Sequence, residues 1–131
     1  MRILFVCIHN ACRSQMAEAF FNHYAAGASA SSAGSKPAKQ IDSAAVAVMK
    51  EKSIDISGKI PQSVEHFRGQ KFDYVITMGC GDACPFVAAP HRIDWQIPDP
   101  KGKPISEYRR VRDEIEGKIL SLIRELGLAP K

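Results

Sequence analysis

The chain has 131 residues, of which 45% are hydrophobic and 24% are charged, as is typical of one soluble globular domain. This composition excludes a fibrous, coiled-coil or disordered protein, and no apolar run reaches the roughly 20 residues that cross a membrane. The formal net charge of +4 permits an anionic ligand, but the basic residues are scattered, so we expect no nucleic acid partner.

Hydrophobic periodicity and turn residues predict strands that alternate with helices along residues 1–131, which we interpret as a single domain. The expected elements are a strand at 2–6, a helix at 15–26, a strand at 28–33, a helix from 42 or 43 to 52, a helical turn at 63–67, strands at 73–78 and 91–97, and a helix at 106–126. The apolar run at the start stops at Cys7 and is too short for a signal peptide, so we expect a cytoplasmic protein with no membrane partner.

This alternation predicts an α/β fold in which helices cover both faces of a parallel sheet. In such a sheet the ligand site lies at the carboxyl ends of the strands. The loops expected at that edge are 7–14, 79–85 and 98–100.

The first of these loops has the features of an oxyanion-binding loop. It reads Cys7-Ile8-His9-Asn10-Ala11-Cys12-Arg13-Ser14 and joins the first strand to the first helix. The N–H groups of residues 8–14 and the start of the helix can surround an anion, and Arg13 can bind two of its oxygens. The same positive environment and the Ser14 hydroxyl favour the thiolate of Cys7, which we interpret as a nucleophile beneath a phosphate-like group. The alternative is a buried cysteine in a strand-to-helix turn.

This loop and its continuation, CRSQMAEAF, resemble the low-molecular-weight protein tyrosine phosphatase superfamily, and more closely the arsenate reductases built on that fold. Further matches are Ser32-Ala33-Gly34, Asp55-Ile56-Ser57, residues 73–78, Trp95, Asp99-Pro100 and residues 108–112. The resemblance implies a four-stranded parallel sheet in the order 2-1-3-4, flanked by helices. It also implies reduction of arsenate to arsenite for arsenic detoxification.

Two other functions are compatible with the same loop. The first is a phosphatase that hydrolyses phosphotyrosine through a cysteinyl-phosphate intermediate, since phosphate and arsenate have nearly the same shape. The second is a regulatory module that binds an anion without catalysis. The presence of Cys7, Arg13 and Asp99 together argues against this module.

Asp99 is the candidate general acid. It lies between Pro98 and Pro100 in the loop after the last expected strand, where it could equally be a turn residue. The resemblance favours catalysis, because the Asp-Pro pair of the family supplies the proton to the leaving oxygen. Asp94 is a nearby alternative, but it falls within an expected strand.

Cys80 and Cys84 follow the strand at 73–78 and are the candidate thiols for a reductase. A second thiol must attack the sulfur of Cys7 to release arsenite and leave a disulfide. The spacing is similar to that of members that pass the adduct to a small thiol such as mycothiol or glutathione, which leaves an internal relay and an external thiol as alternatives. The expected reductant is thioredoxin, or glutaredoxin with glutathione or mycothiol. The alternatives for this pair are inert buried cysteines or a zinc site, and zinc is disfavoured because Cys7 belongs to the anion loop.

Cys12 is expected to be structural, or a protective partner of oxidised Cys7.

We expect neither a cofactor nor a metal ion. Asn10, Glu18 and Ser32 match positions at which some members of the resembled family bind potassium. Ile60 and Gln62 replace the threonine and aspartate ligands of that site, so the ion is not predicted.

Overall fold

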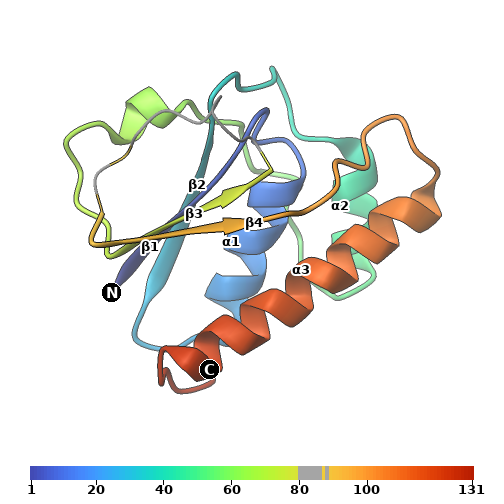
Figure 1. The fold of residues 1–131 in the computed structure, drawn as a ribbon. Coiled ribbons are helices and arrows are strands. Elements are labelled where there is room, and N and C mark those ends of the chain that lie inside the picture. The colour runs from blue at the N-terminus through green and yellow to red at the C-terminus, as the bar shows by residue number, and fades with distance from the viewer. Residues whose placement is uncertain (80–86, 88) are drawn as a thin grey trace.

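The structure is a computed structural model and describes residues 1–79, 87 and 89–131. Its centre is a four-stranded parallel sheet with the order β2-β1-β3-β4 (Figure 1). The strands are β1 (Arg2–Cys7), β2 (Ser29–Gly34), β3 (Tyr74–Met78) and β4 (His91–Trp95). The parallel sheet and its strand order are therefore confirmed. Cys80 and Cys84 lie outside the described residues.

The α-helices gather on one face of the sheet. They are α1 (Arg13–Tyr24), α2 (Ser43–Lys50) and α3 (Ile105–Glu125), and Figure 1 shows them on the same side. In the part of the chain that the structure describes, the opposite face is covered by the 3-10 helix η1 (Val64–Phe67) and adjoining loops. Helices were expected on both faces, but among the described residues this second face carries only a single 3-10 turn. Gly58 and Pro61 precede that turn, and both residues disfavour a longer helix.

Strand β1 lies in the middle of the sheet and divides the core in two. Ile3 and Phe5 pack against the α-helices, whereas Leu4 and Val6 pack on the η1 side. These side chains are almost fully buried, and burial of each contributes about 1.5–3 kcal/mol. The continuous apolar run of β1 reflects this burial on both faces.

Helix α3 closes the core with the apolar face that its sequence predicts. Its buried residues include Tyr108, Val111, Ile115, Ile119, Leu122 and Ile123. Among the described residues, no helix is both long enough and apolar enough to span a membrane.

Two boundaries differ from the expected ones in ways that matter for the site. Helix α1 begins at Arg13 rather than residue 15, because the carbonyl of Cys12 already accepts from the N–H of Met16. Strand β4 ends at Trp95, two residues earlier than expected, so Ile97 belongs to the loop that carries Asp99.

Candidate active site

The loop between β1 and α1 is held from outside by the segment 35–42. Main-chain N–H groups of this segment donate to loop carbonyls in four hydrogen bonds: Ser35 to Cys7 (3.2 Å), Lys36 to Ile8 (2.8 Å), Ala38 to His9 (2.9 Å) and Asp42 to Ala11 (3.0 Å). These carbonyls are thus engaged on the outer side of the loop, whereas the N–H of Asn10 points inward to the Cys7 sulfur at 3.3 Å. Such an arrangement can bind an oxyanion.

Gly34 allows this close packing of the loop against the end of β2. A Cβ atom at this position would lie 2.6 Å from the carbonyl oxygen of Ile8 and 2.9 Å from the N atom of Asn10. The sequence identifies Gly34 only as a match to the resembled family and does not predict that it makes room for the loop. A glycine at the end of a strand is the signal that indicates such an approach.

The sulfur of Cys7 is buried at the base of the loop. It lies 2.9 Å from the Oγ atom of Ser14 and accepts a hydrogen bond from the main-chain N–H of Asn10 at 3.3 Å. The side-chain Nδ2 of Asn10 donates to the same Ser14 Oγ at 2.7 Å. Since Nδ2 can only donate, the hydroxyl hydrogen of Ser14 is available to the sulfur. Both contacts can stabilise a thiolate.

Asn10 gives the loop its shape. Its φ of +51° lies in the left-handed region, which asparagine tolerates better than most residues. Its Oδ1 accepts from the N–H of Gln62 at 2.8 Å and from Nε2 of Gln15 at 3.1 Å. These two donors fix the orientation of the amide and hence direct Nδ2 to Ser14.

Arg13 is buried and connects three parts of the sheet edge. Its Nη1 donates to the carbonyl of Met78 at 2.7 Å and to that of Ile97 at 3.1 Å. Its Nη2 lies 3.6 Å from Oδ2 of Asp99. Gly79 allows this position, because a Cβ there would lie 2.9 Å from Nη1. The guanidinium is therefore held at the carboxyl ends of β1, β3 and β4.

Asp99 lies in the same cavity as Cys7. The cavity has a volume of about 430 Å³, and its lining includes Cys7, Cys12, Arg13, Asp42 and Asp99. Oδ1 of Asp99 accepts from the N–H of Lys101 at 3.0 Å, and its side chain is 38% exposed, so water reaches it.

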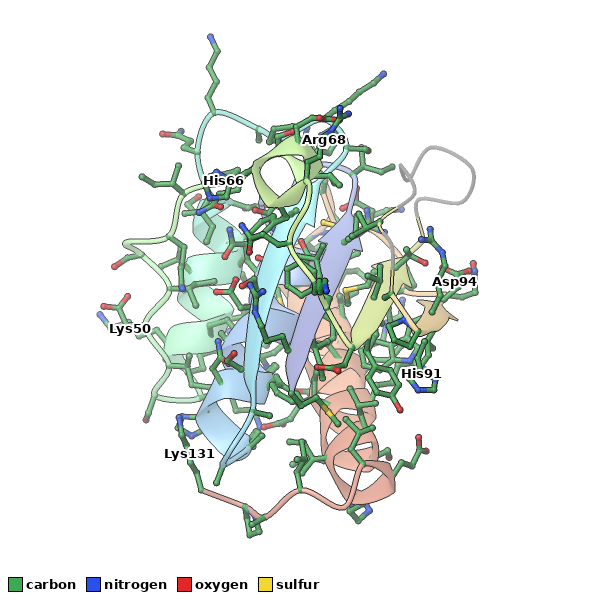
Figure 2. All side chains as sticks on the ribbon, turned by 90° about the vertical axis from the view of Figure 1, so that its left-hand side faces the viewer. Lys50, His66, Arg68, His91, Asp94 and Lys131 are labelled. Atoms are coloured by element: carbon green, nitrogen blue, oxygen red, sulfur yellow. The ribbon has the colours of Figure 1, made fainter. Side chains whose placement is uncertain are left out.

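Asp94 does not line this cavity. It lies on β4 at the edge of the sheet (Figure 2), where its Oδ1 accepts from the hydroxyl of Thr77 at 2.6 Å. The interpretation of Asp94 as a strand residue is therefore confirmed.

Cys12 is the buried thiol between the loop and α1. Burial, followed by the charge of Asp42, raises the pKa of Cys12 well above its usual range, so it is a neutral thiol at physiological pH. A neutral thiol is a weak nucleophile. Within the described ranges, no group of three or more His, Cys, Asp or Glu side chains could hold a metal ion.

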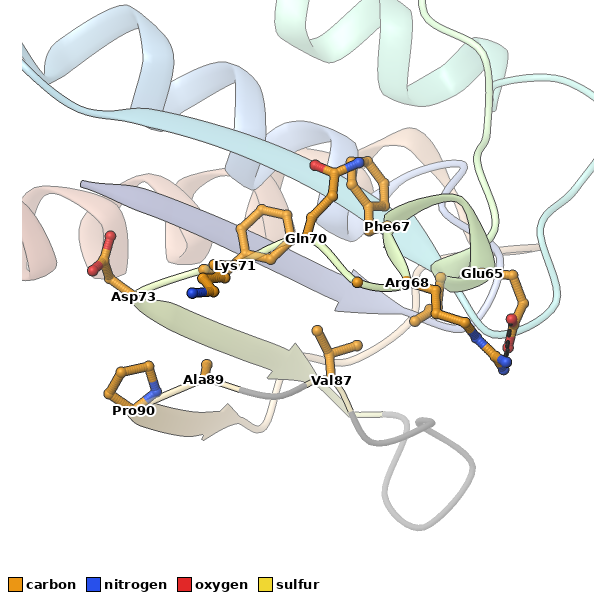
Figure 3. A pocket seen from close by; sticks show the side chains of 12 residues that line it. Glu65, Phe67, Arg68, Gln70, Lys71, Asp73, Val87, Ala89 and Pro90 are labelled. Atoms are coloured by element: carbon orange, nitrogen blue, oxygen red, sulfur yellow. Dashed lines mark hydrogen bonds and ion pairs between the residues drawn. The ribbon is translucent and has the colours of Figure 1, made fainter.

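A larger cavity, with a volume of about 970 Å³, lies elsewhere (Figure 3). It is on the η1 side of the sheet, with Phe67 on one side and Val87 and Ala89 on the other, and Phe72 also lines it. None of its lining residues belongs to the oxyanion loop, and Glu65 and Arg68 at its edge pair with each other at 2.7 Å. The polar side chains that catalysis requires therefore converge in the smaller cavity, the one that contains Cys7.

Comparisons with known proteins agree with this geometry. The family model described as low molecular weight phosphotyrosine protein phosphatase matches residues 2–129. The chain is 35% identical to the glutaredoxin arsenate reductase of Synechocystis sp., over 96% of this chain and 98% of that protein.

Solved structures of two arsenate reductases are also similar. The chain superimposes with a TM-score of 0.82 on the arsenate reductase of Archaeoglobus fulgidus, at 35% identity, covering 92% of this chain and 98% of that one. The TM-score is 0.79 for a thioredoxin-dependent arsenate reductase of Corynebacterium glutamicum, at 36% identity, covering 96% of this chain and 61% of that one.

Proposed function

This chain belongs to the low-molecular-weight phosphotyrosine protein phosphatase family, and on that premise we propose that it is an arsenate reductase with Cys7 as its nucleophile. One observation carries the proposal: the Cys7 sulfur lies at the base of an anion-binding loop, in contact with Ser14, and shares its cavity with Arg13 and Asp99. Nucleophile, oxyanion clamp and proton donor are thus within one small space.

In the first step, arsenate binds to the inward N–H groups of the loop and to the guanidinium of Arg13. The Cys7 thiolate attacks arsenic and forms a sulfur–arsenic bond while one arsenic–oxygen bond breaks. The leaving oxygen takes a proton from Asp99 and departs as water. The Ser14 hydroxyl and the N–H of Asn10 contact the attacking sulfur and can donate hydrogen bonds to it.

In the second step, a thiol attacks the Cys7 sulfur. The electron pair of the sulfur–arsenic bond passes to arsenic, which leaves as arsenite, and a disulfide remains on Cys7. Cys80 or Cys84 is the proposed attacking thiol if the relay is internal, and a small thiol takes this role if it is not.

We further propose that a thiol-redox partner restores Cys7. The relatives point in two directions, since the Synechocystis protein is named for glutaredoxin and the Corynebacterium glutamicum protein is named as thioredoxin-dependent. The candidates for this chain are therefore thioredoxin, or glutaredoxin with glutathione or mycothiol.

A phosphatase is the second candidate, because the family model bears that name and the first step is the same for phosphate. A phosphotyrosine phosphatase also needs contacts for a phenyl ring. The described side chains that line the cavity at Cys7 and the neighbouring cavity at Ile97 include no Phe, Tyr or Trp, and the imidazole of His9 is the one aromatic ring among them. This favours a small oxyanion over an aryl phosphate as the substrate.

The decisive experiment measures arsenite formation with thioredoxin, with glutaredoxin plus glutathione, and with glutaredoxin plus mycothiol, each supplied separately. Hydrolysis of an aryl phosphate is measured in parallel, and Cys7→Ser is the inactive control. Arsenite formation with at least one donor is the expected result. Rapid aryl phosphate hydrolysis without arsenite formation from any donor would show a phosphatase instead.

The role of the second cysteine pair is tested with Cys80→Ser and Cys84→Ser. If the relay is internal, either change stops multiple turnover but leaves aryl phosphate hydrolysis intact. Mass spectrometry of arsenate-treated Cys84→Ser should then detect a Cys7–Cys80 disulfide. If both variants reduce arsenate at the full rate with a small thiol, an internal relay through Cys80 or Cys84 is ruled out.

A further inference from the structure

A second, smaller cavity lies behind the oxyanion loop. It has a volume of about 210 Å³ and shares no lining residue with the cavity that contains Cys7. Its lining residues come from α1, from β2 and from the loop after α2: Gln15, Glu18, Ser32, Gly58, Lys59, Ile60 and Gln62. The cavity therefore lies where three separate segments support the loop.

Glu18 is the charged group of this cavity. Its Oε1 accepts a hydrogen bond from the hydroxyl of Ser32 at 3.0 Å, and its Oε2 lies 2.8 Å from Nζ of Lys59. The Glu18 side chain is only 10% exposed, whereas that of Lys59 is 49% exposed. A buried carboxylate requires a counter-charge, and Lys59 supplies it from solvent.

Gln15 adds a second oxygen to the cavity lining. Its Nε2 donates to the carbonyl and the Oδ1 of Asn10, at 3.2 Å and 3.1 Å. Its Oε1 is buried and has no hydrogen-bond partner among the described residues. The cavity thus combines a carboxylate, a hydroxyl and an unpartnered amide oxygen, which is an environment that favours a cation.

The segment that carries Lys59 also holds the catalytic loop. Three residues after Lys59, the N–H of Gln62 donates to Oδ1 of Asn10 at 2.8 Å, and the Gln62 carbonyl accepts from the N–H of Gly34. Asn10 in turn places its own N–H 3.3 Å from the Cys7 sulfur. The Glu18–Lys59 pair is therefore joined to the loop of the nucleophile by the short chain segment from Lys59 to Gln62, and from Gln62 by hydrogen bonds through Asn10 to Cys7.

We propose that Lys59 is a positioning residue for the chemistry at Cys7, in which its ammonium group acts as the built-in cation of the cavity behind the loop. By pairing with Glu18, Lys59 fixes the segment that orients Asn10, and so keeps the loop N–H groups directed at the bound oxyanion. The inference rests on the proposed role of the loop in oxyanion binding, but not on which oxyanion is turned over.

The test replaces Lys59 with methionine, which keeps the length of the side chain but removes its charge. The dissociation constant of inorganic phosphate is measured by isothermal titration calorimetry, and arsenate turnover is measured separately. We expect phosphate binding to weaken by about fivefold in choline chloride. Ammonium or potassium chloride at equal ionic strength should restore most of the loss, because a small cation can enter the oxygen-lined cavity and choline cannot.

Three control variants separate positioning from general destabilisation. Lys52→Met breaks a similar pair, Lys52–Glu116 at 3.2 Å, and should leave phosphate binding unchanged. Lys59→Arg keeps the charge and should bind phosphate like the original protein. Glu18→Gln removes the carboxylate, so its binding should be weak and unresponsive to ammonium. Circular dichroism checks that each variant is folded.

Unchanged phosphate binding by Lys59→Met would overturn the proposal, and so would a loss that small cations do not restore. The failure of arsenate reduction in the original protein would contradict the proposed function alone, because phosphate binding reports on the loop without turnover.

Discussion

Arg13 Nη1 donates to the main-chain carbonyl of Met78 at 2.7 Å and so ties the start of α1 to the end of β3. The two residues are 65 positions apart in the chain. The tie leaves Nη2 directed at the side of the cavity where Asp99 lies. The guanidinium is thus oriented before any oxyanion arrives, which is the condition for strong electrostatic stabilisation of a transition state.

Arg13→Lys should lower kcat/KM for arsenate by about 100-fold or more. A lysine side chain carries the charge but cannot bond the Met78 carbonyl and two oxyanion oxygens in one plane. Steady-state kinetics with arsenate measure the effect. A variant with unchanged kcat and KM would show that Arg13 holds the loop without contacting the substrate.

Gly34→Ala should destabilise the protein by about 1–3 kcal/mol and impair oxyanion binding. The added methyl group would meet Ile8 O at 2.6 Å, and the loop must shift to admit it. Urea unfolding and phosphate titration measure the two effects. Gly117→Ala on α3 is the matched control, since a Cβ there meets nothing within 4 Å, and it should be neutral or stabilising.

Asp99→Asn should slow substrates with poor leaving groups by about 100-fold or more, and slow those with good leaving groups much less. A poor leaving group depends on the donated proton, whereas a good one departs as an anion. A series of aryl phosphates of graded leaving-group acidity provides the measurement. The same loss across the whole series would indicate that Asp99 only shapes the loop.

Cys7→Ser should abolish both arsenate reduction and aryl phosphate hydrolysis, whereas Cys12→Ser should retain most of both. Burial raises the pKa of Cys12, so its thiol is protonated at neutral pH and does not compete as a nucleophile. Parallel assays of the two variants make the comparison. Loss of activity in a folded Cys12→Ser protein would contradict this assignment.

Glu51 should contribute stability at neutral pH that disappears in acid. Hydrogen bonds from Arg109 and then Arg112 lower the pKa of Glu51 from 4.5 to about 2. Because the folded pKa lies below the unfolded one, the contribution is complete above the unfolded pKa and is lost as the pH falls toward about 2. The difference in Tm between the original protein and Glu51→Gln should therefore shrink between neutral pH and about pH 2. A difference that is constant with pH would show that the pair contributes through packing alone.

The sequence predicted those parts of the protein that depend on neighbouring residues. The apolar run of β1, the turn after Cys7 and the amphipathic face of α3 are local patterns, and each predicts its element directly. The loop from Cys7 to Ser14 was found for the same reason, since its nucleophile, arginine and serine lie within eight consecutive positions. The role of Asp99 as general acid was predicted from its Asp-Pro pair and the family resemblance, and it stays a prediction.

Only the tertiary structure decided which distant residues hold this loop. Four of these contacts join segments that are separate in the chain. They are the hydrogen bonds from residues 35–42, the close approach of Gly34, the bonds of Arg13 to main-chain carbonyls and the pairing of Lys59 with Glu18. No local pattern marks a main-chain carbonyl as the partner of a remote N–H or guanidinium. Such contacts exist only when parallel strands bring their carboxyl ends to one edge, and the order of those strands is set by packing of the whole sheet.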